Sequence, residues 1–190
     1  MIPKNGNRFS EKIMLKESTV RKATVRKALP VIKASAALLA LAALPVAASA
    51  QGVIAERNIS SHLARAIADA AMECANNGVG LSVAVVDRSG GLRVLLRGDA
   101  APPHGAELAR RKAYTARTFR RSSLEWAKRS ETALAGQRSL AEVIPLGGGV
   151  PINVGDETIG AVGVSGTSGG QEGDDSCAKA AIAKVADQLK

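Results

Sequence analysis

Two pairs of apolar segments, each pair joined by a very short link, constrain the fold most. Leu81–Asp87 and Leu92–Arg97 are separated only by RSGG, and Val150–Val154 and Thr158–Gly166 only by GDE. Links of this length join adjacent antiparallel strands, because a parallel pair needs a crossover of about a dozen residues or more. The sequence therefore predicts two β-hairpins within an antiparallel sheet.

Helical patterns surround the hairpins, and one further apolar segment lies between them. The first helix begins at Ile59-Ser60-Ser61, where serine is a good N-terminal cap, and Asn76-Asn77-Gly78 ends it. The remaining predicted elements are helices at 106–119, Ser123–Arg129 and Asp174–Leu189 and a third strand at Leu140–Leu146. Helices and hairpins in this order predict an α+β domain, an antiparallel sheet with helices packed on it.

Small residues dominate the surfaces that are expected to meet in the core. The 106–119 helix has a small-residue face, formed by its alanines at 106, 109, 113 and 116, that can lie flat on a sheet. The only aromatic side chains in residues 51–190 are Tyr114, Phe119 and Trp126. The core must therefore consist of Ala, Val, Leu and Ile, which lets neighbouring elements approach closely.

The first 50 residues have the three-part pattern of a secretory signal peptide. Residues 1–33 are polar and basic, Ala34–Ala47 is apolar, and Ala48-Ser49-Ala50 supplies a small-x-small cleavage site. The apolar run is too short for a membrane span, which needs about 20 residues; an uncleaved anchor is the alternative. We expect translation to start at Met1 or Met14, cleavage after Ala50, and a periplasmic or secreted single domain at residues 51–190.

Removal of this segment greatly lowers the net charge of the chain. The 190 residues carry 26 Lys/Arg and 17 Asp/Glu, a formal charge of +9. Nine of these cations and two of the acids lie in residues 1–50, so residues 51–190 carry a net charge of only +2. The basic composition therefore belongs to the export signal and does not indicate a nucleic-acid partner.

Both cysteines, Cys74 and Cys177, lie in the part of the chain that we expect to be exported. In an oxidising compartment two thiols can pair as a disulfide. They can equally be two small buried hydrophobic residues, as free cysteine often is. The residues alone leave both alternatives open.

The same region has two histidines, His62 and His104. His62 falls in the first turn of the first helix, the position of an ordinary exposed residue. His104 follows Pro102-Pro103, which fixes the backbone and lowers the conformational entropy lost when the side chain is held in one place. A neutral imidazole is a good ligand for iron. His104 is therefore the candidate metal ligand, and an ordinary surface histidine is the alternative.

A cationic stripe follows His104 along the 106–119 helix. Its members recur at spacings of three and four residues and so share one face: Arg110, Tyr114, Arg117 and Arg121. Guanidinium groups around an aromatic ring suit a flat apolar ligand with two carboxylates. The alternative is a solvated basic face, partly paired with Glu107 and Glu125. Lys112 is expected on the opposite flank, with its amine in water.

Several motifs of enzymes and cofactor sites do not occur in the sequence. There is no C-x-x-C-H, so any haem would be held without covalent attachment, and there is no G-x-S-x-G nucleophile elbow. GVSG and LGGGVP are rich in glycine, but neither opens a helix as a phosphate-binding loop does. No motif therefore indicates a catalytic role.

Four sequence blocks occur in order along the chain: LSVAVVDRSGGLRVLLRGD, ARRKAYTARTFRR, LGGGVPI and GAVGVSGTSGGQEGDDSCAKAAI. Together they resemble the HbpS/GlcG-like family, a haem-binding family with secreted members, from Ile59 to Leu189. The resemblance implies a profilin-like α+β fold with a five-stranded antiparallel sheet, and self-association into dimers or larger assemblies. The iron ligand is not uniform in this family, so the candidates here are ranked by inventory: His104, then His62, then Tyr114 or Met72.

The resemblance also bears on the proline corner and on the cysteines. The PPH sequence that ends at His104 resembles a variant found in secreted members. Cys74 and Cys177 fall on the first and last predicted helices, where such members carry cysteines. The resemblance thus favours a disulfide between them.

These observations together predict an exported, homo-oligomeric protein that binds haem b without covalent attachment, in order to store, relay or sense it. His104 would be the axial ligand, Tyr114 would flank the ring, and Arg110, Arg117 or Arg121 would meet the propionates. We expect no nucleic-acid partner, and no membrane partner after cleavage. The alternatives are an enzyme or binding protein for a small organic acid or another cofactor, such as a corrinoid, at the same basic site, and a structural oligomer.

Overall fold

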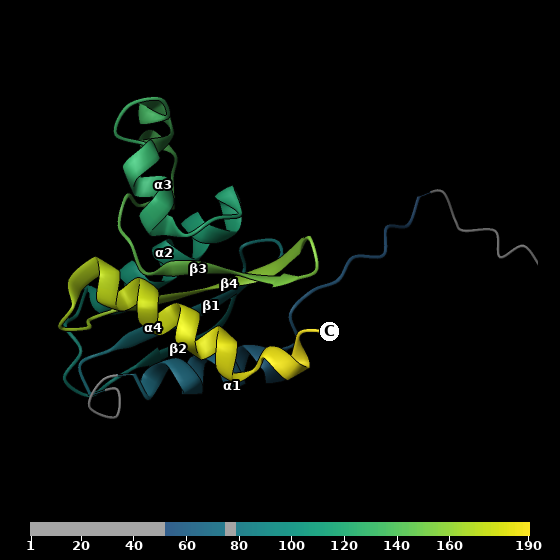
Figure 1. The fold of residues 1–190 in the computed structure, drawn as a ribbon, viewed down its shortest axis with the longest axis horizontal. Helices are drawn as coiled ribbons and strands as arrows, with labels where there is room; N and C mark the ends of the chain where they lie inside the picture. Colours follow the sequence, from purple (N-terminus) through teal and green to yellow (C-terminus); the bar gives the residue numbers. More distant parts are fainter. Residues whose placement is uncertain (1–51, 75–78) are drawn as a thin grey trace, which may run out of the picture. The chain divides into compact units, whose positions relative to one another are not determined.

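A four-stranded antiparallel sheet forms the centre of the structure, a computed structural model that describes residues 52–74 and 79–190 (Figure 1). Its strands are β1 (Ser82–Asp87), β2 (Leu92–Arg97), β3 (Gly149–Val154) and β4 (Glu157–Ser165), in the spatial order β2-β1-β4-β3. The α+β class and both hairpins are confirmed. The predicted count of five strands is wrong for the described part of the chain, and the profilin-like arrangement stays a prediction.

The strand predicted at Leu140–Leu146 does not form, although two of its apolar residues, Val143 and Ile144, are buried. Val143 and Ile144 are 2% and 9% exposed. Their backbone groups bond to side chains of a helix: Thr115 Oγ1 accepts from the Ile144 N–H at 2.9 Å, and Arg111 donates to the Val143 carbonyl at 2.6 Å. Because these groups are already satisfied, the segment packs as irregular chain and adds no strand to the sheet.

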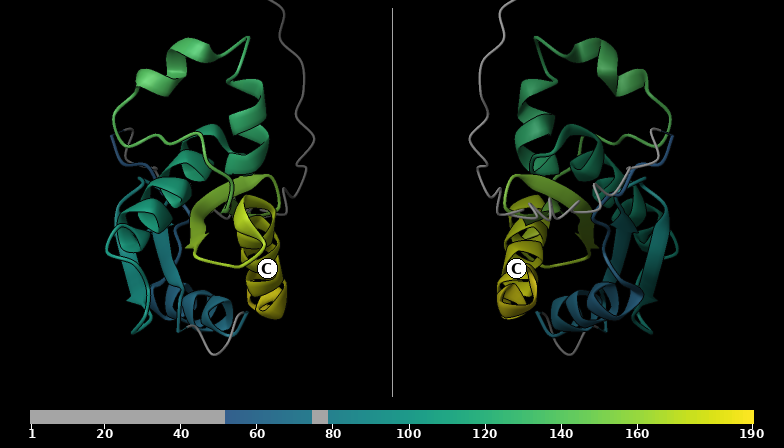
Figure 2. Two further views of the ribbon diagram at one scale, coloured as in Figure 1. Left: turned by 90° about the vertical axis from the view of Figure 1, so that its left-hand side faces the viewer. Right: turned by 90° about the vertical axis from the view of Figure 1, so that its right-hand side faces the viewer.

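Two helices, α1 (Ser61–Met72) and α4 (Gly170–Lys184), lie side by side on one face of the sheet (Figure 2). The Ser60 side chain caps α1 by accepting from the Leu63 N–H at 3.1 Å, as the sequence predicts. The predicted end of this helix at residues 76–78 lies outside the described residues. The last helix begins four residues before the predicted Asp174, and a short 3-10 turn, η3 (Ala186–Gln188), follows it.

A disulfide between Cys74 and Cys177 joins the end of α1 to α4. The two Cα atoms lie 5.7 Å apart, within the usual range for a bridge. Of the two alternatives that the residues left open, the structure therefore contains the disulfide. The bridge holds together the two helices that cover this face of the sheet.

Helix α2 (Gly105–Phe119) crosses the opposite face, and its small-residue side lies directly on the strands. Ala109, Ala113 and Ala116 are fully buried. The approach is so close that a methyl group on Gly163 of β4 would overlap the Ala109 carbonyl oxygen, and one on Gly149 of β3 would overlap backbone of the helix. The predicted flat alanine face is thus confirmed for these three residues, whereas Ala106 is only partly buried, and glycines of the sheet pack against this face.

The next helix, α3 (Ser123–Arg129), has the predicted bounds, and a 3-10 helix, η2 (Ala135–Ser139), follows it. Trp126 is fully buried here: its ring stacks on Phe119 with centroids 4.7 Å apart, and its indole N–H donates to Gln137 at 3.2 Å. Two of the three aromatic residues of the domain therefore serve packing.

The predicted signal peptide and its cleavage site after Ala50 lie outside the described residues. Within residues 52–74 and 79–190, no helix has both the length and the apolar character needed to cross a bilayer.

Candidate ligand-binding face

Strand β2 is at an edge of the sheet and carries exposed leucines on the side where α2 packs. Leu95 lies opposite Ala84, which lies opposite Gly163, the residue that α2 touches. Leu92 lies opposite Val86, which packs against the alanines of α2. Directly opposite residues share a face, so both leucines are on the α2 side. They remain 42% and 47% exposed because α2 does not reach over them.

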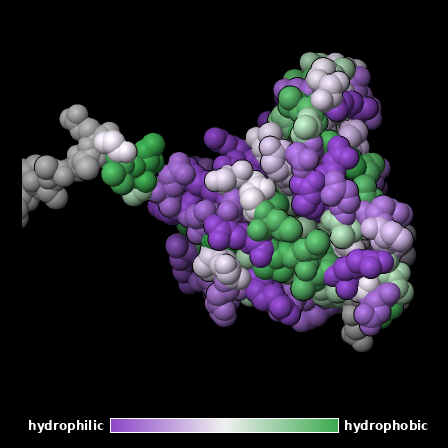
Figure 3. Space-filling model, turned by 180° about the vertical axis from the view of Figure 1, so that it is seen from behind, coloured by the Kyte–Doolittle hydropathy of each residue, from purple (hydrophilic) through white to green (hydrophobic). Residues whose placement is uncertain are grey.

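The other side of β2 is covered, which makes the exposure of the leucines one-sided. Val94 and Leu96 pack against the core beneath α1 and α4. Seen from the side that is hidden in Figure 1, the molecule shows an apolar area bordered by hydrophilic residues (Figure 3). We call the surface between the strand and the helix the β2–α2 face; it comprises Leu92, Leu95 and Arg97 of β2 and Arg110, Tyr114 and Arg117 of α2.

Tyr114 and Arg117 form the end of this face that lies nearest the β1–β2 turn. Tyr114 lies so close to Gly90 that a Cβ there would come within 2.7 Å of its ring. Arg117 is one helical turn further along α2, and its Nε is buried without a hydrogen-bond partner. Among the described residues, it forms no salt bridge. Burial lowers the pKa of this guanidinium, and the nearby charges of Arg120 and Arg88 lower it further.

The other two arginines of the predicted stripe already have acidic partners. Arg110 donates to Glu107 at 3.0 Å and forms an ion pair with Glu142. The bond from Arg110 lowers the pKa of Glu107 below its ordinary value, and the two carboxylates raise the pKa of Arg110. Arg121 lies beyond the end of α2 and pairs with Glu125 at 2.9 Å. Arg110 and Arg121 are thus paired with acidic residues, as expected for the alternative of a partly paired basic face.

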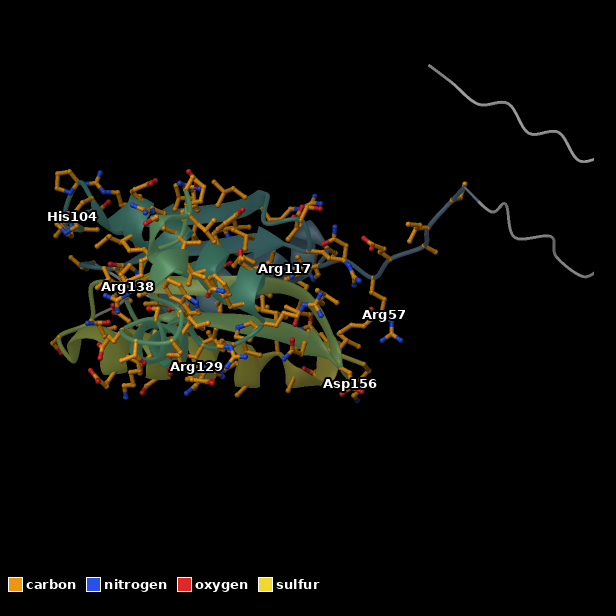
Figure 4. All side chains as sticks on the ribbon, turned by 90° about the horizontal axis from the view of Figure 1, so that it is seen from above. Arg57, His104, Arg117, Arg129, Arg138 and Asp156 are labelled. Carbon is orange, nitrogen blue, oxygen red and sulfur yellow. A yellow bond between two sulfur atoms is a disulfide. The ribbon has the colours of Figure 1, made fainter. Side chains whose placement is uncertain are left out.

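His104 is exposed at the N-cap position, directly before α2, and its side chain makes no capping bond. Arg117 is 13 positions further along the chain, which is about 20 Å along a helix, and Figure 4 shows the two labelled side chains well apart. The N-terminal end of α2, next to His104, is level with Arg97 of β2. This follows because Gly105 lies against Ser82, and Ser82 lies opposite Arg97 in the sheet. A single ligand could contact both ends only by lying lengthwise along α2, over the leucines.

The remaining candidate ligands are elsewhere. His62 is exposed on α1, across the sheet from α2, and Met72 packs against the main core. The described residues contain no group of three or more His, Cys, Asp or Glu side chains placed to hold a metal ion. What these residues offer an iron is therefore a single ligand such as His104.

The prediction for Lys112 is wrong, because this side chain is buried. Its amine donates to the Asp174 carboxylate at 2.7 Å and to the Val164 carbonyl at 3.1 Å. The second oxygen of Asp174 accepts from the Thr167 N–H at 2.9 Å. A signal for this burial exists in the sequence, since Lys112 lies between Ala109 and Ala116 at helical spacing. The ion pair joins α2 to α4, and the bond to Val164 joins α2 to β4.

Sequence reasoning also did not single out Leu92 and Leu95 as surface residues. The available signal is that LRVLLR has apolar side chains on both faces of the strand. Such a pattern indicates burial on both sides for a central strand. Only the position of β2 at the edge shows that one of these faces is open.

Comparisons with known proteins agree on a single family. The family model described as haem degrading protein HbpS-like matches residues 59–183. No protein with a curated description matches the chain. Among solved structures, a double mutant of HbpS from Streptomyces reticuli is 35% identical, with a TM-score of 0.67 over 76% of this chain and 98% of that one.

Two further structures extend the comparison. The PduOC:haem complex is 32% identical and covers 66% of this chain and 94% of that one, with a TM-score of 0.59. The protein ORFY from Klebsiella pneumoniae is 27% identical over 69% of this chain and 92% of that one, with a TM-score of 0.63. The family resemblance read from the sequence is thus confirmed, and the chain belongs to the HbpS-like family.

Proposed function

We propose that this protein binds haem without covalent attachment, outside the cytoplasm, to store, relay or sense it. Membership in a family described by its action on haem and similarity to a structure solved with haem support a haem ligand. The observation in this chain that carries the proposal is Arg117. It is a half-buried guanidinium that lacks an acidic partner among the described residues, beside an aromatic ring and exposed leucines.

The residues of the β2–α2 face fit the chemistry of haem. Arg117 is free to pair with a propionate in a charge-assisted hydrogen bond. Arg110 and Arg121 can do so only by exchanging Glu107, Glu142 or Glu125 for the ligand. Tyr114 flanks the ring, and His104, exposed and held by the proline corner, is the proposed axial ligand. When bound, haem would supply an iron centre with an absorption band that reports its ligands.

Export rests on the signal-peptide pattern of residues 1–50, and it makes a separate prediction. The mature protein should begin at Gln51, which N-terminal sequencing of the secreted or periplasmic form would detect. The homo-oligomer remains part of the proposal, and sedimentation of the same material would measure it.

The proposal is tested by titrating hemin into tag-free protein comprising residues 51–190. We expect a Soret band that saturates with hemin and is strongly weakened in His104→Ala. The matched control is His62→Ala, which removes an exposed imidazole from the opposite side of the sheet and should change nothing. Absence of a Soret band in the wild type contradicts the proposed function, and an unchanged His104→Ala spectrum removes only this ligand.

Arg117→Gln tests the propionate contact independently of the iron. A hydrogen bond to a charged group contributes about 1.5–3 kcal/mol, so hemin affinity should fall by about tenfold or more. Arg65→Gln is the control, because Arg65 is an exposed arginine on α1 that pairs with Asp69. A Soret band that forms and then decays would indicate degradation, the activity in the description of the family.

A further inference from the structure

We infer that Leu92, Leu95 and Arg120 contact the haem, and that its carboxylate edge points toward the C-terminal end of α2. This inference rests on the proposed function and adds an orientation and three contact residues to it. The ring would lie along the β2–α2 face with its apolar edge over Leu95.

The two leucines are the apolar centre of the face. Register places Leu95 in the same row as Ala84 and Gly163, and Gly163 lies under Ala109 and Ala113 in the middle of α2. Leu92 is in the next row on this side, toward Tyr114 and the β1–β2 turn. Both lie between His104 and Arg117, the residues that a lengthwise ligand would have to span. An apolar ring placed there would remove both side chains from water, which is favourable in proportion to the apolar area covered.

Among the described residues, two arginines without a salt bridge, Arg117 and Arg120, lie at the C-terminal end of α2, whereas the other end of the face has one, Arg97. Arg120, the residue that caps α2 in a left-handed conformation with φ of 52°, is exposed. In the part of the chain that the structure describes, neither Arg120 nor Arg117 forms a salt bridge, and the charges that act on Arg117 are those of Arg120 and Arg88, opposed by those of Asp87 and Glu56. Two guanidinium groups at the same end of a helix, neither in a salt bridge, favour a ligand with two carboxylates on one edge.

A second copy of the chain fits this face less well than a dianionic ring. Around a two-fold axis, the same surface would meet itself, so the unpaired cations of one protomer would approach Arg97 or Arg117 of the other. Arg97 donates to the Ala101 carbonyl and has no acidic partner among residues 52–74 and 79–190. Like charges at an interface disfavour association. Charge complementarity therefore selects the anionic ligand.

The experiment compares hemin with iron-free protoporphyrin, which has the same ring and carboxylates but no metal. Leu95→Glu should weaken binding of both by about tenfold or more, because it places a charged carboxylate against the apolar edge of the ring. Arg120→Gln should weaken both and should lose its effect on a porphyrin whose carboxylates are esterified. Leu140→Glu is the control, since Leu140 is similarly exposed, at 50%, but lies at the end of η2.

The outcomes separate this inference from the proposed function. A wild type that binds no hemin overturns the proposed function, and with it this orientation. A wild type that binds hemin, with Leu95→Glu and Arg120→Gln both unchanged, overturns this inference alone. A Leu95→Glu variant that changes the sedimentation coefficient but not porphyrin affinity assigns the leucines to a contact between copies and also overturns it. Arg120→Gln keeps the test decisive if Leu95→Glu does not fold, because the Arg120 side chain is exposed.

Discussion

Lys112→Met should destabilise the protein strongly, because it leaves a carboxylate buried without its cation. The side chains of Lys112 and Asp174 are only 3% and 6% exposed. Removal of one partner of such a pair costs about 3–5 kcal/mol. The Thr167 N–H remains as a partner of Asp174 but cannot neutralise it. Since small domains unfold with a free energy of about 5–15 kcal/mol, the loss would be a large fraction of the total.

The double variant Lys112→Met/Asp174→Asn separates charge burial from the loss of packing. It removes the unpaired charge and retains an acceptor for the Thr167 N–H, so it should recover most of the lost stability. Unfolding in guanidinium chloride measures the stability of both variants. The signal is the fluorescence of Trp126, which is the only tryptophan in the chain and is fully buried. Lys128→Met, an exposed change on α3, is the control. A loss below about 1 kcal/mol in the single variant, or no recovery in the double variant, would refute the reasoning.

Two other changes test how the layers are held together. Replacing Cys74 and Cys177 by serine should lower the free energy of unfolding by about 2–4 kcal/mol, because the bridge closes a loop over a sequence separation of 103. Reductant should lower the free energy of unfolding of the wild-type protein by the same amount. A wild-type protein whose stability does not change with reductant would contradict the disulfide. Gly163→Ala should cost about 1–3 kcal/mol or more, since its methyl group overlaps the Ala109 carbonyl; unchanged stability in the same assay would contradict the close contact.

The parts of the fold that the sequence predicts are those set by near neighbours. The hairpins, the Ser60 cap and the bounds of α3 depend on residues only a few positions apart. The buried state of Lys112 depends on Asp174, 62 residues away, and no local pattern specifies that contact. The false strand at Leu140–Leu146 has the same origin, because only the tertiary contact with Thr115 shows that its backbone bonds to α2.

In the candidate site too, some features follow from local spacing in the sequence and others depend on tertiary structure. Pairing of Arg110 with Glu107 and of Arg121 with Glu125 follows from spacings of three and four residues, which the sequence displays. The unpaired state of Arg117 does not follow from spacing, because it depends on which segments surround the C-terminal end of α2. The openness of Leu92 and Leu95 depends on the strand order β2-β1-β4-β3, which the sequence does not reveal.

The open face of β2 is a consequence of how one helix covers four strands. Strands lie about 4.8 Å apart, whereas a helix with its side chains is about 10–12 Å wide, so a single helix covers about two strands. Among the helices of the described residues, α1 and α4 cover the opposite face, and α2 alone crosses this one. Glycines at 149 and 163 draw α2 against β3 and β4, away from β2, which it contacts least. The same close packing that stabilises α2 therefore leaves Leu92 and Leu95 uncovered beside Tyr114 and Arg117.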